Sequence, residues 1–354
     1  MTQPPESVDP FASLDRLRSG RHASRDETRH LVDGVLAGTV DLDVFGRWLL
    51  ALADLGESAA EIAGVADALR DRMLPVATAR ATVADTCGTG GDGCGSFNIS
   101  TAAALVAAAA GLPVAKHGNR AVTSRTGSAD VLEALGVAVG TPPAVASRLL
   151  DEIGFCFCLA PTHHPAMSRV GPLRRGLGRP TVFNLVGPLC NPAAASVQVI
   201  GVGRTAAREP LAEAARLLGA RRTLVVSGHV GDATTAFDEI SLFGPTDVID
   251  VTAGTTARLR WTPEHFGMPT QPADRLAALA VAGPAESAAA IREVLGGAAG
   301  PRRDVVVLNA AAALWAADHA DDLPAARAAA ERAIDSGAAA GLLDRLIHAA
   351  SPAS

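Results

Sequence analysis

The stretch from Asp85 to Asp92, which reads Asp-Thr-Cys-Gly-Thr-Gly-Gly-Asp, is the strongest local candidate for ligand chemistry in the chain. Its glycines, Gly88, Gly90 and Gly91, allow the backbone to turn sharply and to approach a ligand closely. Successive N–H groups in such a loop form a concave site for an anion. Because glycine also marks ordinary turns, the loop alone is weak evidence for a phosphate site.

Polar residues follow this loop at the point where a helix is expected over residues 102–110. Asn98, Ser100 and Thr101 are residue types that cap helices, so a purely structural role is one explanation for them. A glycine-rich loop that leads into a polar helix N-terminus is also a common phosphate site, because free N–H groups and the helix dipole both favour negative charge. We therefore expect a phosphate group between the loop and this helix.

A second polar segment, residues 116–124, follows a short apolar strand expected at 114–115. Ligands bind at the carboxyl ends of strands in open α/β sheets, so this segment is expected at the ligand-binding edge. Lys116 supplies a positive charge for a phosphate, and Ser128 is expected to cap the next helix. Further polar groups come from Asn119, Thr123 and Ser124. The alternative is a plain polar loop, which the grouping of Lys, His, Asn and Arg within five residues disfavours.

Two adjacent carboxylates, Asp238 and Glu239, suggest a site for a hard cation. Mg²⁺ prefers oxygen ligands and often bridges carboxylates to the phosphates of a substrate. An isolated acidic pair is more often a solvated surface feature, because exposed acids are the norm. The magnesium hypothesis therefore depends on the phosphate-binding segments described above.

A group of arginines follows the motif His-Pro-Ala-Met at residues 164–167. Arg174 is a candidate for binding the carboxylate of a substrate through two parallel hydrogen bonds, which the planar guanidinium is suited to make. Arg169, Arg175 and Arg179 lie close by in the sequence. Spacing alone does not choose among these four residues.

The first part of the chain predicts helices only. Two capping-box patterns, at 24–27 and 58–61, mark helix N-termini, and an apolar stripe over 41–56 predicts a helix between them. We therefore expect a small helical domain over residues 13–76, preceded by a flexible tail over residues 1–12.

From residue 81 onward, short apolar runs alternate with helical patterns, which predicts an α/β sheet covered by helices on both faces. The expected strands are 114–115, 155–159, 198–202, 224–226 and 248–251, and the expected helices are 129–135, 142–153, 206–218, 284–295, 305–317 and 324–336. Segment 165–192 contains five prolines and is expected to form a structured crossing between two lobes. The α/β domain is placed at residues 77–354.

Composition argues against several classes of function. The 354 residues carry a net charge of −6 and no basic run, so nucleic-acid binding, which depends on basic side chains, is disfavoured. Residues 1–10 lack the features of a secretory signal, and the longest apolar run, 102–115, is too short and too interrupted to span a membrane. The five cysteines are an odd number and fit reduced thiols. We therefore expect a cytoplasmic protein.

Together these motifs resemble the anthranilate phosphoribosyltransferase family along almost the whole chain. The segments that carry the resemblance read, in order, GTGGD, FNIST, KHGNRAVTSRTGSADVLEALG, HPAM, PTVFNLVGPLCNP, FDEIS, TPEHFG and IDSGAA. The resemblance implies a small N-terminal helical domain beside a large α/β domain whose central mixed sheet is flanked by helices, as in nucleoside phosphorylases. It also implies a homodimer formed through the helical domain.

The resemblance further implies an activity and its site residues. Phosphoribosyl would pass from phosphoribosyl pyrophosphate to the amine of anthranilate, giving N-(5-phosphoribosyl)anthranilate and pyrophosphate in tryptophan biosynthesis. Phosphoribosyl pyrophosphate would contact Gly88, Gly91, Asp92, Ser96, Asn98, Ile99, Ser100, Thr101, Lys116, His117, Gly118, Asn119, Arg120, Ala121, Val122, Thr123, Ser124 and Ser128. Mg²⁺ would bind Ser100, Asp238 and Glu239, and anthranilate would contact Gly88, Asn119 and Arg174. The catalytic contributions would come from Lys116, Arg174, Asp238 and Glu239.

Two positions depart from the usual family pattern. Segment 227–239 is longer, with Ala236 in place of a glycine, so the metal loop is expected to be reshaped or to include Asp232. Ser96 stands where threonine is common and keeps the hydroxyl. Three alternatives remain open: transfer to another aromatic amine, pyrimidine nucleoside phosphorylase activity, and a non-catalytic relative that binds nucleic acid.

Overall fold

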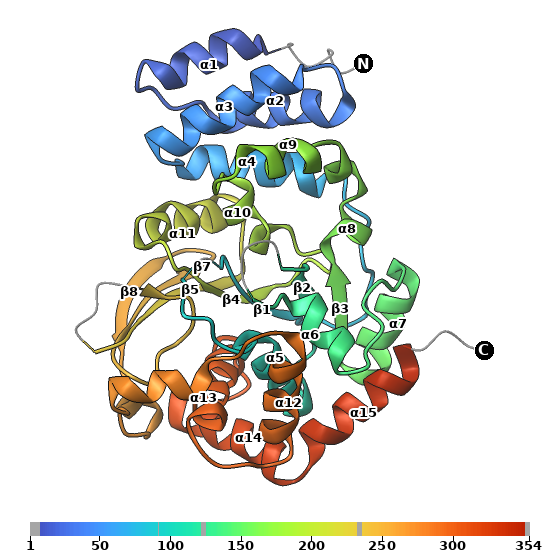
Figure 1. Cartoon of the computed structure of the whole chain (residues 1–354), viewed down its shortest axis with the longest axis vertical. Helices are drawn as coiled ribbons and strands as arrows, with labels where there is room; N and C mark the ends of the chain where they lie inside the picture. Colours follow the sequence, from blue (N-terminus) through green and yellow to red (C-terminus); the bar gives the residue numbers. More distant parts are fainter. Residues whose placement is uncertain (1–7, 91, 122–124, 232–235, 351–354) are drawn as a thin grey trace.

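The structure, a computed structural model, describes residues 8–90, 92–121, 125–231 and 236–350. A bundle of helices forms one end of the molecule, at the top of Figure 1, and a sheet covered by further helices forms the rest. This arrangement confirms the predicted combination of a small N-terminal helical domain and a large α/β domain.

The bundle begins with four helices whose ends follow the predicted caps. They are α1 (Pro10–Arg18), α2 (Arg25–Ala37), α3 (Leu42–Leu55) and α4 (Ala59–Arg70). Ser24 and Asp41 accept backbone N–H groups at the starts of α2 and α3. Ser58 and Glu61 form a complete capping box at α4. Local side-chain hydrogen bonds therefore fix where these helices begin.

The predicted flexible tail over residues 1–12 is too long, because residues 10–12 form the first turn of α1. Asp9 accepts the N–H of Phe11 at 2.9 Å, and Pro10 occupies the first helical position. Proline suits that position, since its fixed φ is helical and its missing N–H would be unpaired anyway. The Asp-Pro pair is therefore a helix start signal. Residues 1–7 lie outside the described part of the chain.

The segment between the third and fourth strands of the sheet returns to the bundle. It contains α8 (Ala160–His163), a 3₁₀ turn (Pro165–Arg169), α9 (Gly171–Leu177), α10 (Phe183–Val186) and a second 3₁₀ turn (Pro188–Cys190). Leu173 lies against Gly46 of α3, where an added Cβ would come within 3.0 Å of it. Phe183 meets Phe45 edge-on, with ring centroids 6.2 Å apart. Two distant stretches of the chain therefore share one helical unit.

The sheet is mixed. Its strands are β1 (Ala84–Gly88), β2 (Val114–Gly118), β3 (Phe155–Leu159), β4 (Val197–Gly201), β5 (Arg222–His229), β6 (Ala236–Phe237), β7 (Thr246–Thr252) and β8 (Thr256–Trp261). Their order is β3-β2-β1-β4-β5-β7-β8, and β6 pairs with β5. The first five strands in this order are parallel, whereas β6 and β7 are antiparallel to β5 and β8 is antiparallel to β7. The carboxyl ends of the parallel strands therefore meet at one edge.

Alternate residues of the central strands pack into two cores. Val199 and Val226 belong to one core, and their neighbours Ile200 and Val225 belong to the other, as expected for strands buried on both faces. The second core continues through α11 (Arg208–Leu217) into the helical bundle. The first is covered by α5 (Ile99–Ala109), α6 (Ser128–Ala134), α7 (Pro143–Ile153), α12 (Pro284–Leu295), α13 (Pro301–Ala316), α14 (Leu323–Asp335) and α15 (Ala338–Ala350). In Figure 1, α5 and α12 to α15 lie below the sheet, and α7 lies beside β3.

Several elements go beyond those expected from the sequence, among them β1, β8 and α15. Strand β1 carries Asp85 and glycine, residue types that are depleted in strands and that favour a loop. Strand β8 is the last strand in the sheet order and displays Arg258 and Arg260, charges that are typical of a protected edge strand. Helix α15 follows the last predicted helix after a glycine in the left-handed conformation, Gly337 with φ 75°.

Two further features concern membrane-spanning helices and the state of the cysteines. Within the described residues, none of the helices combines the length and the apolar character needed to cross a bilayer. All five cysteines are free thiols.

Candidate functional site

Glycines line the edge of the sheet where the acidic pair lies. Gly88 ends β1, Gly201 ends β4 and Gly228 lies near the end of β5. An added Cβ at Gly201 would overlap the carbonyl oxygen of Asp238, and one at Gly228 would come within 2.5 Å of the carbonyl oxygen of Glu239. An added Cβ at Gly88 would come within 2.5 Å of Asp238 Oδ2. The missing side chains therefore form a trough that holds the backbone of the pair.

The carboxylate of Asp238 faces the glycine-rich loop. Its Oδ2 accepts the N–H of Gly90 at 2.9 Å. Burial, and next the neighbouring charge of Asp92, raises the pKa of Asp238 to about 8. The group is therefore held in a position where its negative charge is unfavourable without a cation nearby.

The carboxylate of Glu239 lies at the N-terminus of α5. Its Oε1 accepts the N–H of Ser100 at 3.1 Å. The sequence predicts a substrate phosphate at this helix end, and in the structure this carboxylate uses one of the free N–H groups. Burial, and next the charge of Asp238, raises the pKa of Glu239 well above its ordinary value, while Lys116 opposes the shift.

The oxygen ligands at this edge fit a magnesium ion. Asp238, Glu239 and the hydroxyl of Ser100 supply only hard donors, and a divalent cation would favour the charged form of both carboxylates. Among the described residues no group of three or more His, Cys, Asp and Glu side chains could hold a metal ion. Two carboxylates and a hydroxyl suit Mg²⁺, which usually keeps water ligands and binds substrate phosphates as well.

Lys116 lies beneath this edge and is almost fully buried, with 1% of its surface exposed. Its ammonium group donates to the carbonyl oxygen of Thr86 and to Ser100 Oγ at 3.3 Å. Burial lowers the pKa of Lys116, and the nearby carboxylate of Asp85 acts in the opposite direction. The positive charge predicted for this site is therefore next to the acidic pair.

The carboxylate of Asp85 ties the sheet to the proline-rich crossing. One oxygen accepts the N–H of His117 at 3.2 Å, and the other accepts Asn191 Nδ2–H at 2.8 Å. Asn191 also donates to the carbonyl oxygen of Ala115 at 2.7 Å. Neither Asp85 nor Asn191 was assigned a role from the sequence, although both stand in or beside motifs that carried the resemblance.

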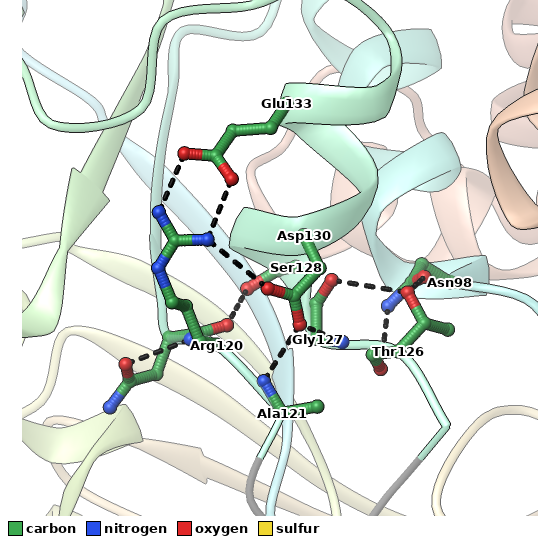
Figure 2. A network of polar contacts seen from close by, with 9 residues as sticks. Asn98, Arg120, Ala121, Thr126, Gly127, Ser128, Asp130 and Glu133 are labelled. Atoms are coloured by element: carbon green, nitrogen blue, oxygen red, sulfur yellow. Dashed lines mark hydrogen bonds and ion pairs between the residues drawn. The ribbon is translucent and has the colours of Figure 1, made fainter. Parts of the chain in front are cut away.

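The segment after β2 is closed by one acidic side chain, shown in Figure 2. Asp130 Oδ2 accepts the N–H of Ala121 at 2.8 Å and the N–H of Gly127 at 2.9 Å, so it holds both ends of the loop. Arg120 donates to Glu133 through two bonds of 2.6 Å and to Asp130 at 3.3 Å. Burial alone would raise the pKa of Asp130, but these backbone N–H groups and Arg120 lower it.

The helix after this loop does not begin as predicted. Gly127 occupies the N-cap position of α6 and Ser128 is the first helical residue, so Ser128 is not the cap. The hydroxyl of Ser128 instead donates to the carbonyl oxygen of Asn119 at 3.3 Å. Gly127 is required because an added Cβ would come within 2.7 Å of the Asn119 carbonyl oxygen and closer still to Ala121 N. A serine at the cap would not fit.

Asn98 joins three segments through its side chain. Its Oδ1 accepts the hydroxyls of Thr126 at 3.0 Å and Ser287 at 2.8 Å, and its Nδ2 donates to the carbonyl oxygen of Thr126 at 3.4 Å. Figure 2 shows Asn98 beside Thr126 at the base of the loop. Its side chain thus braces the loop against α12.

The remaining predicted ligands fall into three groups. Ile99 and Thr101 are buried in the core, 1% and 0% exposed. Ser96 forms an isolated bridge with Ala280, while Gly118 packs closely against Ser128. Gly91, Val122, Thr123, Ser124 and Asp232 lie outside the described part of the chain.

Three of the four candidate arginines have other surroundings. Arg169 lies against Gly38, Arg179 pairs with Asp54 at 2.7 Å, and Arg175 is exposed. Arg169 and Arg179 contact other groups and Arg175 faces solvent, so Arg174 remains the candidate for binding a substrate carboxylate.

Arg174 lies over an aromatic ring in the crossing. Its guanidinium carbon is 5.0 Å from the centroid of the Phe183 ring. Burial lowers its pKa, and no acidic side chain in the described residues forms an ion pair with it. A partly buried guanidinium beside an aromatic face suits a ligand that has both an aromatic ring and a carboxylate. In the described part of the chain, no hydrogen bond joins Arg174 to the acidic pair.

Comparison with known proteins identifies the family to which the chain belongs. Two family models match, "Glycosyl transferase family, helical bundle domain" over residues 12–73 and "Glycosyl transferase family, a/b domain" over residues 80–340. An anthranilate phosphoribosyltransferase of Methylorubrum extorquens (strain PA1) is 46% identical over 341 residues, which cover 96% of this chain and 98% of the relative. The chain belongs to the anthranilate phosphoribosyltransferase family. A relative from Desulfatibacillum aliphaticivorans is 43% identical over 335 residues, with 94% and 96% covered.

Solved structures of this family agree with the fold. The anthranilate phosphoribosyltransferase of Thermus thermophilus has a TM-score of 0.87 at 41% identity, covering 96% of this chain and 99% of that one. The Saccharomyces cerevisiae enzyme in complex with PRPP and Mg has a TM-score of 0.85 at 28% identity, covering 96% and 97%. The same enzyme in complex with 4-fluoroanthranilate has a TM-score of 0.84 at 27% identity, covering 96% and 97%. The family resemblance inferred from the sequence motifs is thus confirmed.

Proposed function

We infer that this chain transfers phosphoribosyl from phosphoribosyl pyrophosphate to the amine of anthranilate, with Mg²⁺, in tryptophan biosynthesis. Two arrangements of residues support this inference. A half-buried acidic pair rests on a trough of glycines, and a guanidinium without an acidic partner among the described residues lies over Phe183 elsewhere on the same chain. The first arrangement suits a metal-bound pyrophosphate, and the second suits a carboxylated aromatic amine.

The acidic pair and its neighbours would act at the pyrophosphate end. Asp238, Glu239 and Ser100 would hold Mg²⁺, which neutralises charge as pyrophosphate departs. Lys116 adds a fixed positive charge next to Ser100. The loop held by Asp130 presents Asn119 and Arg120 at the carboxyl end of β2. Such prearranged charges and dipoles stabilise the departing group without reorganising at the moment of reaction.

Arg174 would act at the acceptor end. Two parallel hydrogen bonds to the anthranilate carboxylate would orient the amine toward C1 of the ribose. Holding the reactants in this orientation favours the transfer. An arylamine is nucleophilic without losing a proton, so a strong general base is not required. His117 is a weak base, which agrees with this mechanism, because burial lowers its pKa to about 3. Its Nδ1 lies 3.0 Å from the carbonyl oxygen of Gly187. The ring is therefore neutral.

Two further properties are part of the proposal. The α1–α3 face carries an open groove lined by apolar residues such as Leu50 and Leu55 and by the charged residues Arg18, Arg47 and Asp54, and Phe11 of α1 is 56% exposed. A groove with apolar and charged residues beside an exposed phenylalanine supports a homodimer formed through the bundle. The free thiols support a reducing compartment, the cytoplasm.

Loss of anthranilate fluorescence tests the reaction. The purified protein is mixed with anthranilate, phosphoribosyl pyrophosphate and Mg²⁺, and each component is omitted in turn. We expect fluorescence to fall only in the complete mixture, with one pyrophosphate released per anthranilate consumed. Unchanged fluorescence with folded protein would overturn the assignment to anthranilate. Turnover of another arylamine, or phosphorolysis of thymidine or uridine, would then identify the alternative.

A further inference from the structure

The chain leaves the acidic pair through Ile240, and one side chain bonds both polar groups of that residue. Asn309 Oδ1 accepts the N–H of Ile240 at 3.0 Å, and Asn309 Nδ2 donates to the carbonyl oxygen of Ile240 at 3.2 Å. The second Nδ2 hydrogen is available for the carbonyl oxygen of Val305, 2.9 Å away on the same helix. Both polar atoms of the Asn309 amide therefore have hydrogen-bond partners, and two of the three bonds are to Ile240.

Asn309 is an unusual residue for its position. It is 3% exposed, in the middle of α13 and among apolar residues that form the core. A buried amide is costly unless it is hydrogen-bonded, so an apolar side chain would be the ordinary choice here. The bonds to Ile240 are what compensate this cost. They tie a core helix to the residue that directly follows Glu239.

Asn309 also lies next to the predicted metal ligands. A cavity of about 10 Å³ is lined by Asn309 together with Glu239 and Ser100. The asparagine therefore faces the same space as two of the three oxygen donors. Its contacts act on the backbone of the pair and not on the carboxylates themselves.

Other local contacts hold the pair from the opposite side, that of the sheet. The N–H of Ser241 donates to Thr246 Oγ1 at 2.9 Å, and the hydroxyl of Ser241 donates to the carbonyl oxygen of His229 at 2.6 Å. Together with the glycines at the strand ends, these bonds fix the backbone of Glu239 from the sheet side. Asn309 fixes it from the helix side.

We propose that Asn309 is the positioning residue of the divalent-cation site, holding Asp238 and Glu239 where both carboxylates reach one cation with Ser100. The proposal rests on the proposed function, because it takes the acidic pair as the metal site. Two adjacent carboxylates repel each other and separate unless the backbone prevents it. Asn309 acts through Ile240 and touches neither substrate nor metal, so it contributes to metal affinity by geometry alone.

Binding of Mn²⁺ to the full chain tests this role without an activity assay. Free Mn²⁺ is measured by electron paramagnetic resonance during titration of wild type, Asn309→Ala and Asn309→Ser. Serine in a helix can bond the carbonyl oxygen four residues earlier, here Val305, but it cannot reach Ile240. Both variants are expected to bind Mn²⁺ at least about 10-fold more weakly, the effect of losing about 1.4 kcal/mol.

Two controls separate the possible outcomes. Ser13→Ala removes a buried hydrogen bond to Trp48 in the bundle, 3.1 Å long in the structure, and is expected to leave Mn²⁺ affinity unchanged. Glu239→Gln tests the metal site itself and is expected to lose the binding. If Glu239→Gln binds Mn²⁺ as wild type does, the metal assignment in the proposed function fails. If Glu239→Gln loses binding while both Asn309 variants stay within twofold of wild type, the role of Asn309 alone is refuted.

Discussion

Arg174 shows how the surroundings of one residue distinguish it from its neighbours. The sequence offers four arginines and no means of choosing among them. The structure gives Arg179 an acidic partner and leaves Arg175 exposed, whereas Arg174 is partly buried over Phe183. A buried guanidinium without an acid is costly, so it is usually retained for a ligand.

Replacing Arg174 by alanine is expected to raise the anthranilate KM about 10- to 100-fold, because hydrogen bonds to a charged group contribute about 1.5 to 3 kcal/mol. The KM for phosphoribosyl pyrophosphate should change little, since Arg174 has no bond to the acidic pair within the described residues. Initial rates over a grid of both substrates measure this. Arg175→Ala is the matched control and should behave as wild type. An unchanged anthranilate KM in Arg174→Ala would rule out the carboxylate role.

The pKa of Asp238 leads to a second prediction at this scale. Burial and the charge of Asp92 raise it to about 8, above its unfolded value. The contribution of protonated Asp238 to the free energy of unfolding is therefore fully present below the unfolded pKa. It is lost as the pH rises through about 8. Asp238→Asn removes this loss.

In metal-free protein with a chelator, Asp238→Asn is expected to raise Tm by about 2 °C or more, the effect of about 1 kcal/mol in a chain of this size. The difference in Tm between Asp238→Asn and wild type should widen between about pH 5 and about pH 8. Over this interval the raised pKa of Asp238 makes its charged form unfavourable in the folded protein. Activity should fall sharply in the same variant. Thermal melts at several pH values measure the effect, and a variant less stable than wild type at about pH 8 would contradict it.

At the scale of elements, the loop after β2 depends on the first turn of α6. Asp130 receives N–H groups from both ends of the loop, and Glu133 one turn later holds Arg120. The exposed pair between Arg120 and Glu133 contributes little, as is usual for surface ion pairs. The partly buried backbone bonds to Asp130 should matter more.

Asp130→Ala is expected to raise the KM for phosphoribosyl pyrophosphate about 10-fold or more, because two backbone N–H groups lose a charged acceptor. Glu133→Gln serves as control and should change that KM less than about threefold. Steady-state kinetics with saturating anthranilate distinguish the two. Equal effects in both variants would show that the surface pair, and not the closure by Asp130, organises the loop.

The elements that could be predicted are those with strong periodic patterns and caps. Helix α12 matches its predicted range, and α4 begins at its predicted capping box. Strand β1 could not be predicted because Asp85 is unfavourable in a strand unless its carboxylate is bonded, and its partner Asn191 is 106 residues away. The trough of glycines likewise depends on the pairing of β1, β4 and β5. Long-range contacts of this kind leave no local pattern in the sequence.

For the site, the structure places Glu239, Ser100 and Lys116 close together at one edge of the sheet, but their individual contacts could not be predicted from the motifs. Asn98, predicted as a ligand, uses its side chain on Thr126 and Ser287. Asn309 carries one signal, a single amide in an otherwise apolar stretch of helix, which by itself does not point to a site. The surroundings of such a residue become known only when the helix is packed against the rest of the chain.

At the scale of the whole molecule, the bundle and the sheet are joined by two passes of the chain that run together. The N–H of Leu74 donates to the carbonyl oxygen of His163 at 2.7 Å, and the N–H of Val76 donates to that of Pro192 at 2.9 Å. His164 is bonded at this junction to the carbonyl oxygen of Cys190 at 3.1 Å, and its ring lies 5.1 Å from that of His117. Both rings are buried.

Burial lowers the pKa of His164 to about 4 and that of His117 to about 3, below the unfolded value. Their stability contribution is thus complete above about pH 6.5 and is lost as the pH falls toward those values. The free energy of unfolding should fall on the order of 2 kcal/mol for His164 between about pH 7 and about pH 5. Urea denaturation of wild type and His164→Gln measures the effect, and an equal fall in both would contradict it.

The position of a metal ion, in crystals grown with phosphoribosyl pyrophosphate and with Mn²⁺ in place of Mg²⁺, tests the assignment of the acidic pair without relying on kinetics. We predict an anomalous difference peak within about 2.3 Å of oxygens of Asp238, Glu239 and Ser100, a distance typical of hard divalent cations. The pyrophosphate should bind the same ion, close to the glycine-rich loop. A peak bound by other side chains, with the acidic pair left in its present hydrogen bonds, would contradict the assignment.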